Sequence, residues 1–235
     1  MTTRLDQRPS EPRQVGRRAV TRGAAWSIPV ISLAVAAPAM AASGCKMTTG
    51  QLSWDVFADN SDQTGKALAT TGGTGVTVTV SLSGDTGASR NGQVTSTTTG
   101  GLSKVLRFYD LNNSANTAQT VTLTFSKPIQ NLSFSLLDVD SAKQGNQASY
   151  EDLVIINTAG WTATKHSNVM GSGTAAAPYR AVNQNSPVAG SSADSNVDLS
   201  WTGPISSVSF TYKQDGSVNG DPFIGISDIA FQYCL

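Results

Sequence analysis

Charged side chains are scarce in this chain of 235 residues, because only 14% of them are Asp, Glu, Lys or Arg, against about a quarter in ordinary globular proteins. The 16 basic and 16 acidic residues cancel, yet six arginines lie before residue 42 beside only two acidic residues. The rest of the chain is therefore slightly acidic, and its basic residues are scattered singly. Phosphate backbones are bound by clustered Lys and Arg, so we expect no nucleic-acid partner.

Residues that carry catalytic chemistry are equally few. The chain has one histidine and two cysteines, no Gly-x-Ser-x-Gly element and no His or Cys spacing typical of a metal site. His166 falls in a predicted loop and is expected to be a surface residue. Glu151 and Asp152 are neighbours on a predicted strand, where adjacent side chains point to opposite faces, so they make a poor catalytic pair. A glycoside hydrolase or another secreted enzyme is therefore the least favoured functional class.

Residues 1–41 have the layout of an export signal. A polar, arginine-rich leader ends at Arg22, a moderately apolar stretch covers residues 28–37, and the small residues Ala39 and Ala41 flank Met40 in a cleavage site. We predict that residues 1–41 form a cleavable signal peptide and that the mature protein begins at Ala42.

The apolar part of the leader is too weak for a permanent membrane anchor. It is rich in alanine, is interrupted by Pro29 and Pro38, and is followed directly by the cleavage site. The pair Arg17-Arg18 resembles a twin-arginine signal, and the general secretory route is the alternative. Both routes lead out of the cytoplasm, so we expect a secreted protein, free or associated with the cell surface.

The two cysteines bracket the mature chain. Cys45 lies near its start and Cys234 is next to last, so an exported protein would join its two ends through one disulfide. Lipid attachment to Cys45 is the alternative, because a small residue precedes it just after the signal. Ala42 stands where such sites usually have leucine, which favours the disulfide.

Alternating apolar and polar residues run through the mature chain. In 76–82 and 120–125, for example, apolar residues alternate with Thr and Ser, which gives each segment one buried and one hydrated face. Such alternation, bounded by turn-forming residues, predicts about ten short strands, at 52–57, 76–82, 93–99, 104–110, 120–125, 131–136, 152–157, 197–201, 207–211 and 224–233.

These strands, with no helical periodicity, predict an all-β protein. We expect residues 42–235 to form a single antiparallel β-sandwich of jelly-roll type. The polar, glycine-rich segments 59–75 and 166–196 are expected to be long loops.

Asp138 and Asp140 stand two apart at the end of a predicted strand, so their side chains project to one side. Two close carboxylates favour a hard divalent cation, and we predict a structural Ca²⁺ with Asp152 and Asp228 as further ligands. The alternative is that these aspartates cap turns and accept hydrogen bonds from backbone amides.

Aromatic residues supply a second possible site, because flat exposed rings stack on sugars. Trp161 and Tyr179 flank the expected loop region and are candidate ligand contacts. An exposed shelf formed by these two residues would indicate a carbohydrate-binding module.

Three segments resemble a recurrent extracellular β-sandwich domain of exported surface proteins from high-GC Gram-positive bacteria: residues 121–140, 150–154 and 223–231. The signal at residues 17–41 is similar to theirs too. The resemblance implies an exported β-sandwich without implying a ligand. We therefore expect a non-catalytic surface domain with a structural or adhesive role, whose partner is a polysaccharide or another cell-surface component. A carbohydrate-binding module with a structural calcium is the alternative.

Overall fold

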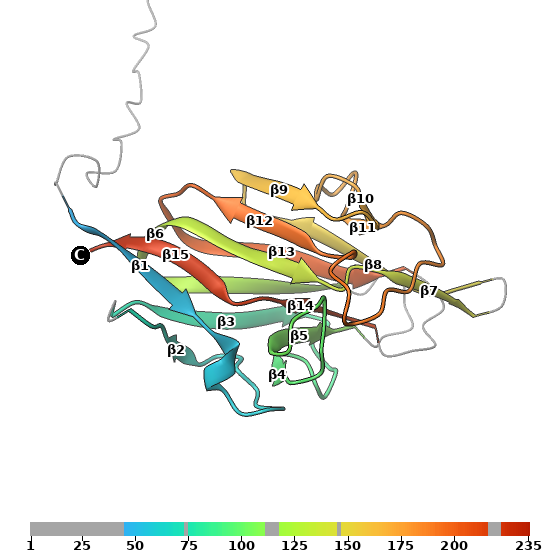
Figure 1. The fold of residues 1–235 in the computed structure, drawn as a ribbon, viewed down its shortest axis with the longest axis horizontal. Coiled ribbons are helices and arrows are strands. Elements are labelled where there is room, and N and C mark those ends of the chain that lie inside the picture. The colour runs from blue at the N-terminus through green and yellow to red at the C-terminus, as the bar shows by residue number, and fades with distance from the viewer. Residues whose placement is uncertain (1–44, 73–74, 111–117, 145–146, 216–221) are drawn as a thin grey trace, which may run out of the picture. The chain divides into compact units, whose positions relative to one another are not determined.

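The computed structural model describes residues 45–235 except 73–74, 111–117, 145–146 and 216–221. The predicted signal peptide 1–41 and the predicted mature start at Ala42 lie outside the described residues. Within them the regular structure is β, apart from one 3-10 turn, η2 (Trp54–Val56), which confirms the predicted all-β antiparallel sandwich (Figure 1). In the described part of the chain, no helix has the length and apolar character needed to cross a membrane.

One continuous, hydrogen-bonded sheet curls into two layers. The first layer contains, in spatial order, β2 (Ala67–Ala69), β3 (Thr77–Gly84), the first half of β6 (Ala118–Leu137), β13 (Ile205–Gln214), β8 (Gln147–Ile156) and β7 (Ser141–Gln144).

The second layer is built on the other half of β6. Its strands are β9 (Trp161–Lys165), β12 (Val197–Trp201), β14 (Phe223–Ile226), β15 (Ile229–Cys234), β5 (Val105–Tyr109), β4 (Gln93–Thr95) and β1 (Met47–Leu52). Strands β14 and β15 follow one another along β6, so β5 pairs with β14 and β1 pairs with β15. Strands β10 (Val169–Met170) and β11 (Arg180–Ala181) form a separate pair.

Strand β6 differs from the prediction, because it replaces two expected strands with one of 20 residues. The sequence predicted separate strands at 120–125 and 131–136, with Pro128 between them. Instead the strand continues, and its partner β13 shifts register between Ile205 and Ser207, opposite this point. A proline that lacks an N–H is tolerated where the ladder is already interrupted.

Three further segments also differ from the prediction. The expected strand 52–57 is wrong apart from its first residue. Strand β1 ends at Leu52, and the Ser53 hydroxyl then accepts a hydrogen bond from the amide of Asp55 and starts η2. The expected loops 59–75 and 166–196 contain β2 and the β10–β11 pair, respectively. Pairing with strand β3 and burial of Val169 and Ala181 outweighed the loop-like composition.

The core lies between the two layers and is rich in aromatic rings. Phe125 of the first layer meets Phe231 of the second at 5.7 Å between ring centroids, and Phe210 meets Phe108 at 5.8 Å, both edge to face. Burying such rings is the main favourable term in the stability of a β-sandwich.

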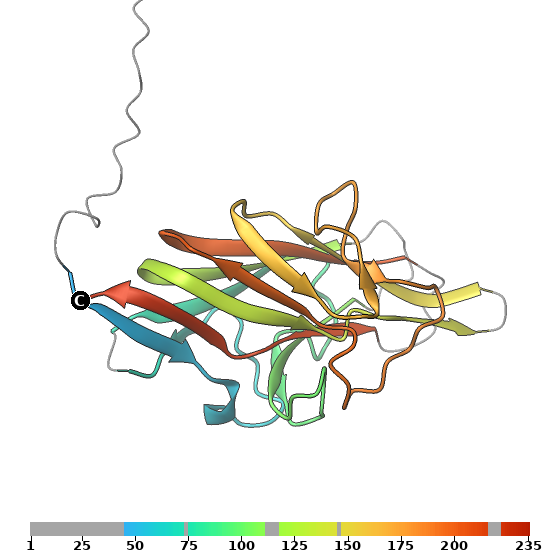
Figure 2. The same ribbon diagram turned by 45° about the horizontal axis from the view of Figure 1, so that its top comes forward.

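The predicted disulfide is confirmed: Cys45 and Cys234 are joined, with their Cα atoms 5.6 Å apart. Strands β1 and β15 lie side by side next to it, from Met47 opposite Cys234 to Leu52 opposite Ile229 (Figure 2). With its sulfur in this bond, Cys45 has no thiol left for lipid attachment.

Removing the disulfide should lower the free energy of unfolding by up to about 5 kcal/mol, because a loop of 189 residues is no longer closed in the unfolded chain. Urea unfolding of the oxidised protein with and without reductant measures this loss. The Cys45→Ser/Cys234→Ser double variant is the control and should not respond to reductant. Equal midpoints for the oxidised and reduced wild type would contradict the prediction.

Candidate functional site

Three of the four predicted calcium ligands lie in one buried polar cluster at the end of the first layer. Asp138 and Asp140 follow β6, and Asp152 belongs to β8. The amide of Asp152 donates to the Asp140 carbonyl at 3.0 Å, and the amide of Asp140 donates to Oδ2 of Asp152 at 3.2 Å. Asp152 is fully buried and Asp140 nearly so.

The oxygens of this cluster accept hydrogen bonds mainly from the protein itself. Oδ1 of Asp152 accepts from the Tyr212 hydroxyl at 2.8 Å and from Nε2 of Gln214 at 2.6 Å. Oδ2 of Asp140 accepts from the amide of Val188 at 2.7 Å. Two buried oxygens have no hydrogen-bond partner, namely Oδ1 of Asp138 and Oε1 of Gln214.

Burial makes ionisation of these carboxyls unfavourable. It raises the pKa of Asp138 to about 7, with a further increase from the nearby charge of Asp140. Burial also raises the pKa of Asp140, although the Val188 amide and the Tyr150 hydroxyl counteract it. For Asp152, burial and then the charge of Asp140 raise the pKa well above the ordinary range. A carboxyl that loses water without a counter-charge favours its protonated form.

Asp228, the fourth predicted ligand, lies elsewhere. It stands between β14 and β15, where its Oδ1 accepts from the amide of Trp54 at 2.8 Å and its Oδ2 accepts from Nε2 of Gln51 at 3.0 Å. It thus ties η2 and β1 to the end of β14. Among the residues that the structure describes, no three His, Cys, Asp or Glu side chains are arranged to hold a metal ion.

The two aromatic ligand candidates do not form an exposed shelf. Tyr179 is only 2% exposed, because its backbone pairs with Val154 in both directions and its ring packs against Gly173. Trp161 is half-buried against the core, and its Nε1 donates to the Tyr179 hydroxyl at 3.2 Å. Tyr179 is therefore a core residue. The prediction that Trp161 and Tyr179 contact a ligand on an exposed aromatic surface is wrong for Tyr179.

His166 is partly exposed, as expected. Its Nε2 lies 3.1 Å from Oδ2 of Asp198, and Oδ1 of Asp198 accepts from the Ser135 hydroxyl at 2.6 Å. The aspartate thus stands between the histidine and the serine. A serine nucleophile needs the histidine as its direct hydrogen-bond partner, so this arrangement is not a catalytic triad.

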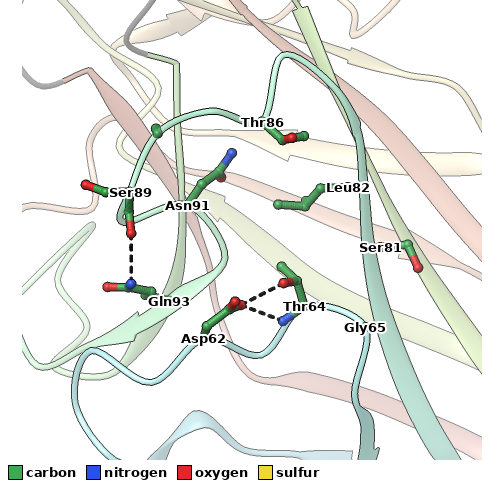
Figure 3. A pocket seen from close by; sticks show the side chains of 10 residues that line it. Asp62, Thr64, Gly65, Ser81, Leu82, Thr86, Ser89, Asn91 and Gln93 are labelled. Carbon is green, nitrogen blue, oxygen red and sulfur yellow. Dashed lines mark hydrogen bonds between the residues drawn. The ribbon is translucent and has the colours of Figure 1, made fainter.

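A polar cleft of about 510 Å³ opens beside β3. Figure 3 shows Leu82 and Asn91 pointing into it, with Asp62 and Thr64 on one wall and Thr86 on the opposite side. The volume falls within the range of small-ligand sites. Among the described residues that line it there is no aromatic ring, and Asp62 is the one charged side chain.

Most strong polar groups of the cleft are already engaged. Oδ1 of Asp62 accepts from the amide and the hydroxyl of Thr64, both at 2.8 Å. Nδ2 of Asn91 donates to Gln119 at 2.8 Å, and Nε2 of Gln93 donates to the Ser89 carbonyl at 3.0 Å. The cleft can offer a carboxylate oxygen and hydroxyls to an uncharged polar molecule, and its described lining residues include no acid–base pair.

The sequence interpretation missed Tyr212 and Gln214 as partners of Asp152. Both occupy inward positions of β13, where the alternation places Val208 and Phe210. A glutamine in an apolar register was the available signal, because a buried amide requires polar neighbours.

Comparison with known proteins adds no relative: no family model, no curated protein and no solved structure matches this chain.

The raised carboxyl pKa values predict that stability falls as pH increases. In the unfolded chain an aspartate ionises near pH 4, whereas Asp138 in the folded protein ionises near 7. The folded state therefore binds more protons in this window, and the free energy of unfolding should decrease between about pH 4 and about pH 7.

The Asp138→Asn variant isolates this contribution. It should lose less stability than the wild type between about pH 5 and about pH 8, by about 1 to 2 kcal/mol, since Asp138 keeps some contact with water. Urea unfolding at both pH values measures the difference. Asp55→Asn, at an exposed position, is the control, and identical pH profiles for Asp138→Asn and the wild type would refute the assignment.

Proposed function

We propose that this chain is an exported, non-catalytic β-sandwich domain with a structural or adhesive role outside the cytoplasm, free or at the cell surface. The observation that carries the proposal is the disulfide between Cys45 and Cys234. Structural disulfides persist in oxidising compartments, whereas the cytoplasm keeps thiols reduced. The arginine-rich leader before Ala42 supports the same location.

The non-catalytic part of the proposal is supported by how the polar side chains are used. The carboxylate of Asp198 separates His166 from Ser135, and the carboxyls of Asp140 and Asp152 accept hydrogen bonds from backbone and buried side chains. Polar residues in these roles stabilise a fold rather than transform a substrate.

Export predicts a specific mass. Protein recovered from the culture medium of an expressing cell should have the intact mass of residues 42–235 with both cysteines oxidised, and alkylation without reductant should add nothing. Replacing Arg17-Arg18 by Lys-Lys should retain the precursor inside the cell if the twin-arginine route operates, and should leave export unchanged if the general secretory route does. A mass that includes residues 1–41, or two alkylated thiols, would overturn the proposal.

We also propose a structural Ca²⁺ at the buried cluster, with Asp138, Asp140 and Asp152 as ligands; their side chains do not surround a common point in the structure, so binding requires them to move. Two unpartnered oxygens, Oδ1 of Asp138 and Oε1 of Gln214, support this, because buried oxygens without donors are ligands that a hard cation prefers. Asp228 is left out of this set, since it lies away from the cluster, between β14 and β15, where it is bonded to Gln51 and Trp54.

Calcium at about one hundred times its dissociation constant should add about 2.7 kcal/mol to stability. The melting temperature in millimolar calcium should therefore exceed that in chelator by several degrees, most clearly at about pH 8, above the pKa of Asp138. Asp140→Asn should remove most of this gain, while Asp228→Asn should keep it. Equal melting temperatures with calcium and with chelator would reject the calcium site, and the aspartates would then serve only as hydrogen-bond acceptors.

A further inference from the structure

The outer face of the first layer carries a regular array of hydroxyl groups. The residues come from β3, the first half of β6 and β13, at the positions that alternate with buried Val80, Leu123 and Phe210. We call this array the hydroxyl grid, and it consists of three rows of three residues: Ser83, Thr120 and Thr211; Ser81, Thr122 and Ser209; Thr79, Thr124 and Ser207.

The register places the members of each row directly opposite one another. Thr122 faces Ser81 on one side and Ser209 on the other, so it occupies the centre of the grid. Neighbouring strands lie about 4.8 Å apart and alternate residues of a strand about 6.7 Å apart, which sets the spacing of the array. All nine side chains are at least partly exposed.

The composition of the grid excludes most kinds of partner. Its nine members include no charged, aromatic or large apolar side chain. Along β13, the next residue on the same face is Lys213, which carries a charge. Protein interfaces rely on aromatic and apolar anchors, nucleic acids require clustered positive charge, and membranes require apolar or basic surface. Ser and Thr hydroxyls instead donate and accept hydrogen bonds without charge, as sugar hydroxyls do.

We propose that the hydroxyl grid docks onto an ordered, uncharged polysaccharide surface. This inference rests on the proposed adhesive function and names its partner. A single hydroxyl pair contributes little net affinity in water, because both groups must first release water. Many pairs formed at once by a rigid grid on a repeating surface give useful avidity, so the protein should bind insoluble polymer and leave soluble oligosaccharides unbound.

The cleft opens on the other side of β3. Figure 3 shows Ser81, a member of the grid, on the side of β3 opposite Leu82, which points into the cleft. The grid and the cleft are therefore separate surfaces, and the docking proposal concerns the grid alone.

The other layer offers a matched control surface. Its exposed face also carries serines and threonines, among them Ser200 on β12, whose hydroxyl lies 2.7 Å from that of Thr162. This face includes the His166–Asp198 pair, so its hydroxyls surround a charge rather than form an uncharged array.

Depletion of the exported protein from solution by microcrystalline cellulose and by chitin powder tests the proposal. At least one of the two should bind the wild type, with little change in about 1 M NaCl, which screens charge interactions. Thr122→Lys should lower the partition coefficient by about tenfold or more, while Ser200→Lys should leave it unchanged. Thr122→Val, which keeps the branched shape and removes only the hydroxyl, should give a smaller loss in the same direction.

Four outcomes would overturn the proposal: no depletion by either polymer, binding abolished by salt, equal losses for Thr122→Lys and Ser200→Lys, or a dimer in sedimentation that Thr122→Lys dissociates. The last would assign the grid to a second copy of the chain. Melting temperatures verify that each variant is folded. If Thr122→Lys does not fold, the binding loss of Thr122→Val tests the proposal in its place. Because export and oxidation are measured by mass, failed binding by an exported, oxidised protein rejects the grid alone.

Discussion

Strand β6 is the constraint on which the rest of the sandwich depends. It pairs with β3 and β13 through its first half and with β12, β14 and β15 through its second half. Since one strand runs through both layers, its alternation sets which residues of each layer face the core. The same register also aligns the hydroxyls of Thr120, Thr122 and Thr124 with those of the neighbouring strands.

The disulfide holds the N-terminal strand of the sandwich against its C-terminal strand. Strand β1 has β15 as its ladder partner, and the ladder ends beside the bond between Cys45 and Cys234. Asp228 secures the other end of β1 through Gln51 and the amide of Trp54. An edge strand that is fixed at both ends resists fraying, which is compatible with the extracellular location proposed for this domain.

Unlike the two ends of strand β1, the buried polar cluster contains groups whose hydrogen bonding is incomplete. Around Asp152, the side chains of Tyr212 and Gln214 satisfy an otherwise costly buried carboxyl, and Asp138 lacks such a donor. A partly satisfied interior network makes stability sensitive to protons or cations. The uncharged hydroxyl grid lies on the outside of the same layer and carries no such sensitivity, so pH and calcium should affect the fold more than the docking surface.

Alternation along the chain was enough to predict an all-β sandwich and the strand at 197–201 with its exact bounds, and the number and positions of the cysteines were enough to predict the pairing of Cys45 with Cys234. Local pattern carries this information because a half-buried strand imposes a period of two, and because two cysteines in an oxidising compartment allow one intramolecular bond. Tertiary structure alone decided the rest. It made β6 continuous through Pro128, buried Tyr179 instead of exposing it, and separated Asp228 from Asp138. These outcomes depend on which distant segments become neighbours, and no local pattern specifies that choice.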